Sequence, residues 1–218
     1  MVSAHYAAEL QSIVLDLPEL QAVLVRDDDY EARLAASSLQ DPDIPIRPED
    51  WCIIRHTGGT TGKSKGVAYS HRSWLAAGSD WFYSFPPMDA GEVCLHVGPI
   101  SHGSGYLYTP TWLSGGVNVL MDHFDPEETL RVMSEEGVGY LFLVPAMLNA
   151  LARHPLAKQL RFPGLKVMQI GGAPIADETA LLAREVFGDV LYQGYGQTEA
   201  VPVCMMGPKE WFSQVPGS

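Results

Sequence analysis

Residues 57–66 read Thr-Gly-Gly-Thr-Thr-Gly-Lys-Ser-Lys-Gly, and they follow a short apolar run, residues 51–56, that predicts a strand. Four glycines in these ten residues allow the backbone to approach a ligand closely and to turn its N–H groups toward it. The threonine and serine hydroxyls add hydrogen-bond donors, and Lys63 and Lys65 add two positive charges. This combination predicts a loop that holds a polyphosphate rather than an ordinary solvated turn.

On the C-terminal side of this loop, strand-length apolar runs alternate with helix signals. Serine or aspartate caps and closing glycines predict helices over 70–79 (cap Ser70), 126–136 (cap Asp125, end Gly137), 145–153 and 177–187 (cap Asp177, end Gly188). The predicted strands are 66–69, 92–97, 117–121, 140–144, 165–170 and, last, 190–193. This alternation predicts an α/β fold with a mixed, largely parallel sheet and flanking helices.

Residues 1–50 predict a lead-in rather than part of this core. An apolar stripe at helical spacing runs from Leu10 to Leu20 and is interrupted by Pro18, and residues 23–25 suggest a short strand. Residues 41–50 are punctuated by prolines, which disfavour regular structure. We therefore expect a division into residues 1–50, a lead-in and connector, and residues 51–218, the α/β core.

The composition excludes several classes of protein. The chain has 218 residues, 46% of them hydrophobic, which suits a globular protein. Its formal net charge of −12 argues against nucleic acid as a partner. Three distant cysteines (Cys52, Cys94 and Cys204), no basic N-terminal region and no apolar run long enough to span a bilayer predict a cytoplasmic protein without an integral membrane segment.

One alternative reading of the loop is a P-loop NTPase, because Gly62-Lys63-Ser64 matches the end of a Walker A motif. The first glycine of that motif would fall on residue 57, which is a threonine, and the residues after the loop predict a strand where a Walker A loop opens a helix. Val117 to Asp122 imitates a Walker B strand, but apolar runs that end in aspartate are common.

Residues 57–66 also resemble the phosphate loop of the AMP-forming adenylating superfamily, which includes acyl- and aryl-CoA ligases, luciferases and adenylation domains. Lys65 and Gly66 match the pattern of that family, whereas Gly58 and Ser64 stand where a hydroxyl residue and a proline are usual. Three later segments are similar in type and order: Pro99 to Gly105 (Pro-Ile-Ser-His-Gly-Ser-Gly), Gly171 to Pro174 (Gly-Gly-Ala-Pro), and Gln193 to Glu199 (Gln-Gly-Tyr-Gly-Gln-Thr-Glu).

This resemblance implies an acid–CoA ligase that uses ATP, Mg²⁺ and CoA and activates a small carboxylic acid to an acyl-adenylate with release of pyrophosphate. A carboxylate is ionised at neutral pH, so the reaction needs charge neutralisation and alignment rather than a general base. The resemblance implies that Lys65, Thr198, Glu199 and His102 are catalytic, with Glu199 as the Mg²⁺ ligand and His102 bordering the acyl pocket, which Val97 and Trp81 could also line. The implied nucleotide-binding residues are Thr57, Gly58, Gly59, Thr60, Thr61, Gly62, Lys63, Ser64, Gly66, Gly172, Ala173, Pro174, Gln193, Gly194, Tyr195 and Gly196.

Members of this family are longer chains, and the family's ribose-binding aspartate, hinge and C-terminal lysine have no counterpart here. We therefore expect part of a ligase or a natural truncation that binds ATP weakly and turns over poorly. A sheet that lacks strands would leave edges that favour a homo-oligomer. A truncated, non-catalytic binding or assembly module remains a third reading, and neither the acid nor the acyl acceptor follows from the sequence.

Overall fold

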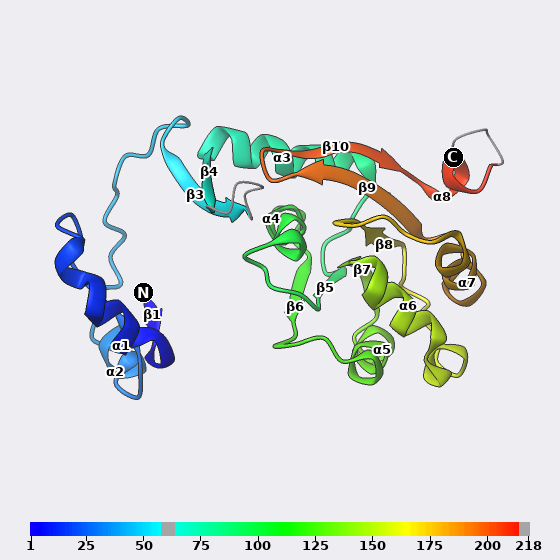
Figure 1. Cartoon of the computed structure of the whole chain (residues 1–218), viewed down its shortest axis with the longest axis horizontal. Coiled ribbons are helices and arrows are strands. Elements are labelled where there is room, and N and C mark those ends of the chain that lie inside the picture. The colour runs from blue at the N-terminus through cyan, green and yellow to red at the C-terminus, as the bar shows by residue number, and fades with distance from the viewer. Residues whose placement is uncertain (58–63, 214–218) are drawn as a thin grey trace. The chain divides into compact units, whose positions relative to one another are not determined.

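A computed structural model describes residues 1–57 and 64–213. The chain divides into two compact units, Met1–Ile46 and Arg47–Ser218, which are considered separately (Figure 1). Among the helices of the described residues, none has both the length and the apolar character that crossing a membrane requires.

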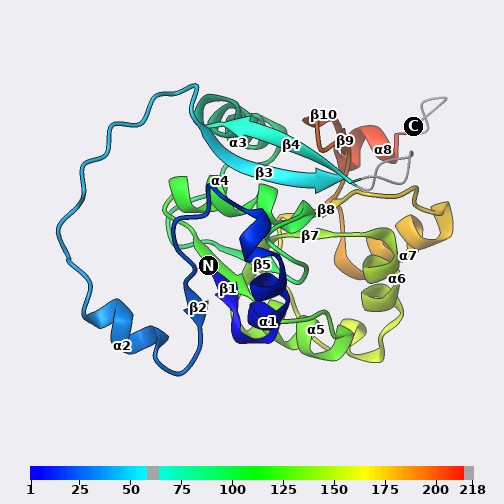
Figure 2. The same cartoon turned by 60° about the vertical axis from the view of Figure 1, so that its left-hand side comes forward.

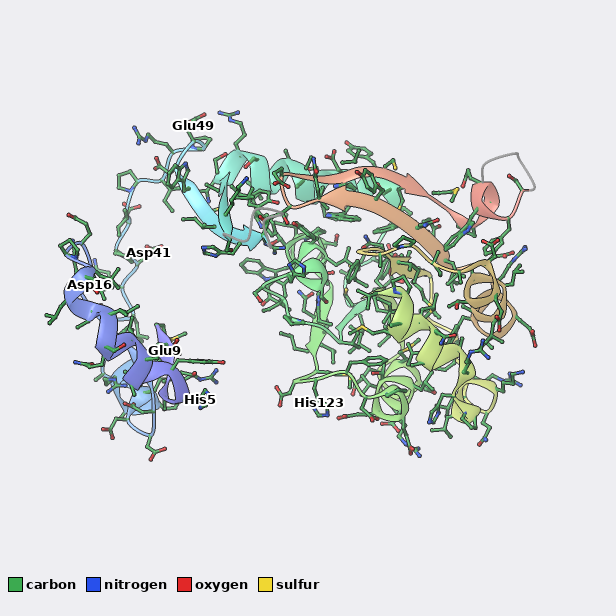
Figure 3. All side chains as sticks on the ribbon, in the orientation of Figure 1. His5, Glu9, Asp16, Asp41, Glu49 and His123 are labelled. Carbon is green, nitrogen blue, oxygen red and sulfur yellow. The ribbon has the colours of Figure 1, made fainter. Side chains whose placement is uncertain are left out.

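The first unit is small and mostly exposed. It contains β1 (Val2–Ser3), α1 (Ala4–Ile13), the short 3₁₀ helix η1 (Val14–Asp16), β2 (Val25–Arg26) and α2 (Tyr30–Ala35), with β1 and β2 paired in parallel. The predicted helical stripe from Leu10 to Leu20 is only partly helical, because α1 ends at Ile13 and the 3₁₀ helix η1 ends at Asp16, before Pro18; α2 was not predicted. Its acidic side chains Glu9, Asp16 and Asp41 are exposed and lie apart from one another (Figure 3), so they form no metal cluster.

The second unit is built on a six-stranded sheet with the order β10-β9-β8-β7-β5-β6. Its strands are β5 (Val93–His96), β6 (Val117–Leu120), β7 (Val138–Leu143), β8 (Val167–Ile170), β9 (Leu191–Gln197) and β10 (Ala200–Met206). All neighbouring pairs are parallel except β9 and β10, which are antiparallel. The predicted mixed, largely parallel α/β sheet is confirmed.

Helices cover both faces of this sheet. They are α3 (His71–Ser84), α4 (Tyr108–Leu113), α5 (Pro126–Glu135), α6 (Pro145–Arg153), α7 (Asp177–Phe187) and α8 (Pro208–Trp211), with 3₁₀ helices η2 (Gly103–Tyr106) and η3 (Pro155–Lys158). Leu141 and Leu143 of β7 pack in one apolar cluster with residues of α5, α6 and α7. Tyr140 and Phe142, which alternate with these leucines along β7, point to the other face, where they pack with Trp81 of α3. The central strands are therefore buried on both sides, as parallel strands usually are.

A separate antiparallel hairpin, β3 (Trp51–Thr57) and β4 (Lys65–Ser70), flanks the predicted phosphate loop. Its register pairs Thr57 with Lys65 and His56 with Gly66. The hairpin contacts α3, beside which it runs (Figure 2). The predicted strands on both sides of the loop are confirmed.

Several boundaries differ from the prediction. Residues 190–193 were expected to form the last strand, but β9 continues to Gln197 and β10 follows it. The sequence did not predict β10, because it contains Pro202 and proline disfavours a strand. The sheet tolerates this proline because β10 is an edge strand. Asp177 is the first residue of α7 rather than its cap, which is Ala176. The helix capped by Ser70 extends to Ser84, because buried Trp81 continues its packed face.

Candidate functional site

The hairpin brings the two ends of the predicted phosphate loop together. Thr57 lies opposite Lys65, and the Ser64 hydroxyl donates a hydrogen bond to the Thr57 carbonyl oxygen at 3.0 Å. Lys65 is exposed at the start of β4. The predicted loop residues Gly58, Gly59, Thr60, Thr61, Gly62 and Lys63 lie outside the described residues.

The second charged element of the predicted site is the turn between β9 and β10. It carries Thr198, which is half-buried, and Glu199, which is exposed. Because β9 and β10 are adjacent antiparallel strands, this turn holds the Glu199 carboxylate at one end of the sheet.

Tyr69 joins the hairpin to this turn. Its hydroxyl donates to the Thr198 carbonyl oxygen and lies 3.2 Å from the Tyr106 hydroxyl, which must therefore be the donor in that pair. Burial, the hydrogen bond with Tyr106 and the nearby Glu199 carboxylate raise the pKa of Tyr69 above its ordinary value, although Arg55 opposes the shift. The phenol therefore stays protonated and keeps its donor role. Tyr69, which bonds the Thr198 carbonyl oxygen, lies four residues of extended β4, or about 13 Å, from Lys65. Lys65 and Thr198, both predicted to bind phosphates, therefore lie in the same part of the second unit.

Beside this junction lies a cavity of about 260 Å³, here called the His102 cavity. It brings together residues from three of the four sequence segments: His102, Gly103, Gly171, Gly172, Gly194, Tyr195, Gly196, Gln197 and Thr198. Its remaining walls are mostly aromatic or apolar, and they come from Trp81, Tyr106, Phe142, Val144 and Val201, with Gln169 as the exception. Trp81 lines this cavity, whereas Val97 lies in the core on the face that α5, α6 and α7 cover.

A second cavity of about 600 Å³, here called the Pro174 cavity, lies next to the first. It is lined by Gly172, Ala173, Pro174, Gln193, Gly194, Tyr195 and Gly196 together with Cys204, Met205 and Met206 of β10. The two cavities share Gly172, Gly194, Tyr195 and Gly196. A ligand that occupied both would therefore cross the C-terminal part of β9.

Glycine is required where the chain turns around these cavities. Gly172 follows β8 with a φ of +83°, a backbone conformation that other residues rarely adopt. A Cβ on Gly105, in η2 beside His102, would lie only 1.7 Å from the Ile100 carbonyl oxygen. The segment from Ile100 to Gly105 therefore folds back on itself more tightly than a side chain would permit.

Arg55 supports this segment from the side of the hairpin. Its side chain is buried and lies over two adjacent rings, with Cζ 4.8 Å from the Trp74 centroid and 4.2 Å from the Tyr106 centroid. Its Nη1 donates to the His102 carbonyl oxygen at 2.9 Å, while Nε has no hydrogen-bond partner among the described residues. Arg55 thus links β3 directly to the wall of the His102 cavity.

We expect Arg55→Lys to lower the free energy of unfolding by about 1–3 kcal/mol, because an ammonium group cannot lie as a plane over the two rings. Arg72→Lys is the matched control, since Arg72 is exposed and pairs with exposed Glu49, a bond worth less than about 1 kcal/mol. Urea denaturation measures both changes. Equal, small effects in the two variants would show that the stacking of Arg55 contributes little.

His96 holds the other side of the same segment. Its Nε2 lies 2.7 Å from the Asn118 amide oxygen, and its Nδ1 lies 3.0 Å from the Ser104 hydroxyl in η2. Burial lowers the pKa of His96 below its ordinary value of 6.5, despite hydrogen bonds with Asn118 and Ser104 that oppose the shift. The imidazole is therefore neutral in the folded protein at neutral pH.

This neutral histidine predicts a pH dependence of stability. Below pH 6.5 the unfolded chain takes up a proton at His96 that the folded protein does not. The free energy of unfolding therefore falls as the pH is lowered, until the pH reaches the pKa of His96 in the folded protein. The slope from this residue is at most about 1.4 kcal/mol per pH unit. We expect His96→Gln to flatten the fall in melting temperature just below pH 6.5; an unchanged slope would assign it to other groups.

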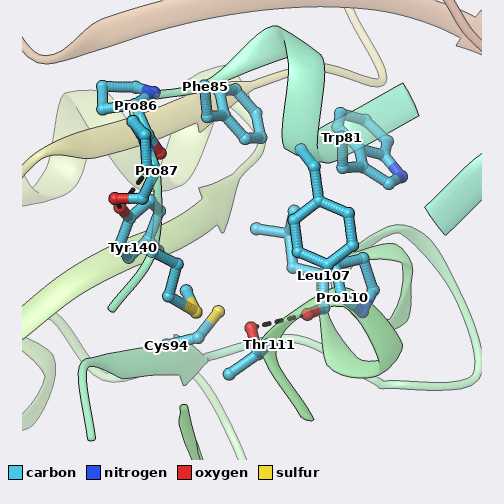
Figure 4. Close-up of a pocket in the computed structure, with 11 residues that line it drawn as sticks. Trp81, Phe85, Pro86, Pro87, Cys94, Leu107, Pro110, Thr111 and Tyr140 are labelled. Carbon is cyan, nitrogen blue, oxygen red and sulfur yellow. Dashed lines mark hydrogen bonds between the residues drawn. The ribbon is translucent and has the colours of Figure 1, made fainter. Parts of the chain in front are cut away.

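A third cavity, of about 30 Å³, does not belong to the candidate site (Figure 4). It is enclosed by Trp81, Phe85, Cys94, Leu107 and Tyr140, among others, and has room for about one water. Burial raises the pKa of the Cys94 thiol to about 12, so this cysteine is unsuited to act as a nucleophile. The ring nitrogen of Trp81 points away from this cavity (Figure 4).

Sequence reasoning missed several residues of the site, namely Arg55, Tyr69, Tyr106 and Gln169. The signal for Gln169 was a single polar residue inside a short apolar strand, whereas Arg55 stands with His56 and Thr57 at the polar end of its strand and gave no such signal. Tyr69 and Tyr106 gave no such signal, because a tyrosine in a strand or loop usually indicates packing alone.

Comparison with known proteins decides which family has this arrangement. The family model described as AMP-binding enzyme matches residues 2–218. The chain belongs to the AMP-binding enzyme family. Curated relatives in that family include a feruloyl-CoA synthase of Amycolatopsis sp, 32% identical over 173 residues that cover 78% of this chain and 34% of the relative. Another is 4-coumarate–CoA ligase-like 5 of Oryza sativa subsp. japonica, 32% identical, with coverage of 91% and 40%.

Solved structures of the family have the same architecture. The N-terminal domain of FACL13 from Mycobacterium tuberculosis superposes with a TM-score of 0.75 and 25% identity, covering 91% of this chain and 50% of that one. ATP-bound MatB from Rhodopseudomonas palustris reaches a TM-score of 0.83 at 22% identity, a likeness of fold, with coverage of 95% and 42%. The chain spans only about a third to two fifths of the length of the two curated relatives named above.

Proposed function

We propose that this chain carries the nucleotide- and acyl-binding core of an AMP-forming acid–CoA ligase. In the first step a carboxylate oxygen attacks the α-phosphorus of ATP, and the bond to the leaving pyrophosphate breaks. In the second, the CoA thiol takes the acyl group as a thioester and AMP leaves. The observation that carries the proposal is the pair of adjacent cavities that share Gly172 and residues 194–196, because an acyl-adenylate needs neighbouring acyl and nucleotide sites.

The residues have distinct roles in this proposal. The His102 cavity takes the acyl group, with His102 at its border, and the Pro174 cavity takes adenine against Tyr195 and the Gly172-Ala173-Pro174 turn. Lys65, with Thr60 and Thr61 of the loop, neutralises the β- and γ-phosphates, and Thr198 hydrogen-bonds the α-phosphate. Bringing a carboxylate against a polyanion in an acidic chain requires this local positive charge.

The chemistry of Glu199 fits a magnesium ion that arrives with ATP. Mg²⁺ usually keeps several waters and binds one or two carboxylates plus the phosphates of its substrate. Among the described residues there is no cluster of three or more His, Cys, Asp or Glu side chains that could hold a metal alone, so an exposed single carboxylate suits a nucleotide-borne ion. When bound, Mg²⁺ would offset the negative charge of the phosphates.

Other features support the remaining parts of the proposal. The names of the relatives favour CoA as the acceptor and a small carboxylic acid as the substrate. The free cysteines, with Cys204 exposed, suit a reduced, cytoplasmic setting. The edges at β6 and β10 could pair in a homo-oligomer. We further propose that residues 51–218 form the binding core and residues 1–50 a lead-in to it.

Binding of a stable acyl-adenylate analogue tests this function without requiring turnover. We expect an acylsulfamoyl adenosine to bind the chain at least about tenfold more tightly than AMP, because it alone fills both cavities. Isothermal titration calorimetry measures both affinities. Equal affinities would contradict the paired-cavity assignment, and the absence of binding by either compound would favour a non-catalytic module.

A further inference from the structure

The turn that carries Thr198 and Glu199 is tied to the rest of the second unit by one hydrogen bond. The register of β9 and β10 shifts just before this turn, between Ala200 and Cys204, so the ladder of the two strands is interrupted there. Apart from the pairing of these two strands, the bond from the Tyr69 hydroxyl to the Thr198 carbonyl oxygen is the single hydrogen bond to Thr198 or Glu199 among the described residues.

That bond comes from the hairpin that also carries Lys65. Side chains alternate between the two faces of a strand, so Lys65, Val67 and Tyr69 of β4 share one face. Tyr69 is buried, whereas Gly66 and Ala68 on the other face are exposed. The residue proposed to neutralise phosphate and the residue that holds the turn therefore stand on the same side of one strand.

The Tyr69 ring is itself held in place by aromatic packing. It meets the Trp74 ring edge to face, with the ring centroids 5.4 Å apart and an interplanar angle of 78°. The Tyr106 hydroxyl bonds the Tyr69 hydroxyl, and the Arg55 guanidinium lies over the rings of both Trp74 and Tyr106. Because Tyr69 is only 7% exposed, its ring cannot turn away from the Thr198 carbonyl oxygen without disturbing this packing.

We propose that Tyr69 is a positioning residue for the magnesium nucleotide, an inference that rests on the proposed ligase function. By bonding the Thr198 carbonyl oxygen, Tyr69 fixes the backbone beside Glu199 and holds that carboxylate at a set place relative to Lys65. A carboxylate that is already in place loses less conformational entropy when it binds the ion. Removal of the Tyr69 hydroxyl should therefore weaken the binding of metal-loaded ATP more than that of metal-free ATP.

The test compares Tyr69→Phe with Tyr140→Phe by calorimetric titration of the whole chain with ATP, with and without Mg²⁺. Tyr140 is the matched control, because it is also buried and its hydroxyl also donates to a main-chain carbonyl oxygen, that of Pro87 at 2.9 Å, outside the candidate site. Tyr69→Phe should weaken Mg·ATP binding about five- to tenfold and change the affinity for metal-free ATP by less than about twofold. Tyr140→Phe should change neither affinity by more than about twofold, although each variant should lose about 2–4 °C in melting temperature with its hydrogen bond.

A double-variant cycle separates positioning from a general loss of structure. If Tyr69 acts through Glu199, Tyr69→Phe should cost no further Mg·ATP affinity in a Glu199→Ala background. Additive losses, or an equal loss with and without Mg²⁺, would overturn the proposal. Mg·ATP binding by Tyr69→Phe as tight as by Tyr140→Phe would overturn it as well, but the ligase function would stand. If the unsubstituted chain binds no Mg·ATP, the proposed function fails and this inference with it.

A spectroscopic measurement on the unsubstituted chain covers the case in which Tyr69→Phe does not fold. The chain is labelled with carbon-13 at the Cζ atoms of its tyrosines and titrated with ATP. Mg·ATP should shift the Tyr69 signal more than metal-free ATP does, because the ion would lie beside the turn that the Tyr69 hydroxyl bonds. A Tyr69 signal that stays unchanged, or that shifts equally with and without Mg²⁺, would contradict the proposal.

Discussion

Gly105→Ala is expected to destabilise the fold by more than about 4 kcal/mol, enough to unfold much of the protein. The added Cβ would lie 1.7 Å from the Ile100 carbonyl oxygen and 2.7 Å from its carbonyl carbon, and both are backbone atoms. A flexible side chain could move aside, but here the turn from Ile100 to Gly105 would have to open. The same turn presents His102 and Gly103 to the cavity, so any folded remainder should lose ligand binding as well.

Gly98→Ala is the matched control for this variant. Gly98 lies in the same connection after β5, and a Cβ there would meet nothing closer than the Ser104 Cβ at 4.0 Å. We expect its free energy of unfolding to change by less than about 1 kcal/mol. Urea denaturation of the two variants measures the difference, and a Gly105→Ala protein as stable as Gly98→Ala would show that the turn is not as tight as described.

The second large effect is expected in nucleotide binding. Lys65→Ala should weaken Mg·ATP binding about 10- to 100-fold, because a charge-assisted hydrogen bond to phosphate contributes about 1.5–3 kcal/mol. Glu199→Ala should weaken it at least about tenfold when Mg²⁺ is present and have little effect on metal-free ATP, since its proposed role is to bind the metal. Calorimetric titrations with and without Mg²⁺ measure both variants.

Lys63→Ala is the control that separates this account from a P-loop NTPase. Lys63 lies outside the described residues, but the residues after the loop, Lys65–Ser70, form strand β4, whereas a Walker A loop opens a helix. We therefore expect Lys63→Ala to weaken Mg·ATP binding far less than Lys65→Ala. The opposite order, with Glu199→Ala silent, would favour the P-loop reading.

The elements of the second unit that the sequence predicted well are those with local chemical signals. Asp125 caps α5 through a 2.8 Å hydrogen bond from the Glu128 amide, and Gly137 follows it with a φ of +61°. Ser70 likewise accepts a hydrogen bond from the Ser73 amide at the start of α3. Such contacts lie within a few residues along the chain, so a sequence pattern can indicate them.

The features that escaped prediction depend on contacts between distant residues. Arg55 is stabilised by Trp74 and by Tyr106, a ring 51 positions away, and Tyr69 bonds to a residue 129 positions along the chain. No local pattern encodes such pairings. For the same reason, sequence motifs indicated which segments form the site, whereas the polar lining at Gln169 emerged only from the packing of β8.

The proposed function requires the chain segments at Lys65 and at Glu199 to hold one magnesium nucleotide between them. Nuclear magnetic resonance with Mn·ATP in place of Mg·ATP tests it most directly, because the paramagnetic ion broadens the amide signals of residues near it. We expect the signals of Lys65 and Gly66 to broaden together with those of Thr198 and Glu199 at substoichiometric Mn·ATP. Broadening of only one of these two segments, or of neither, would contradict it.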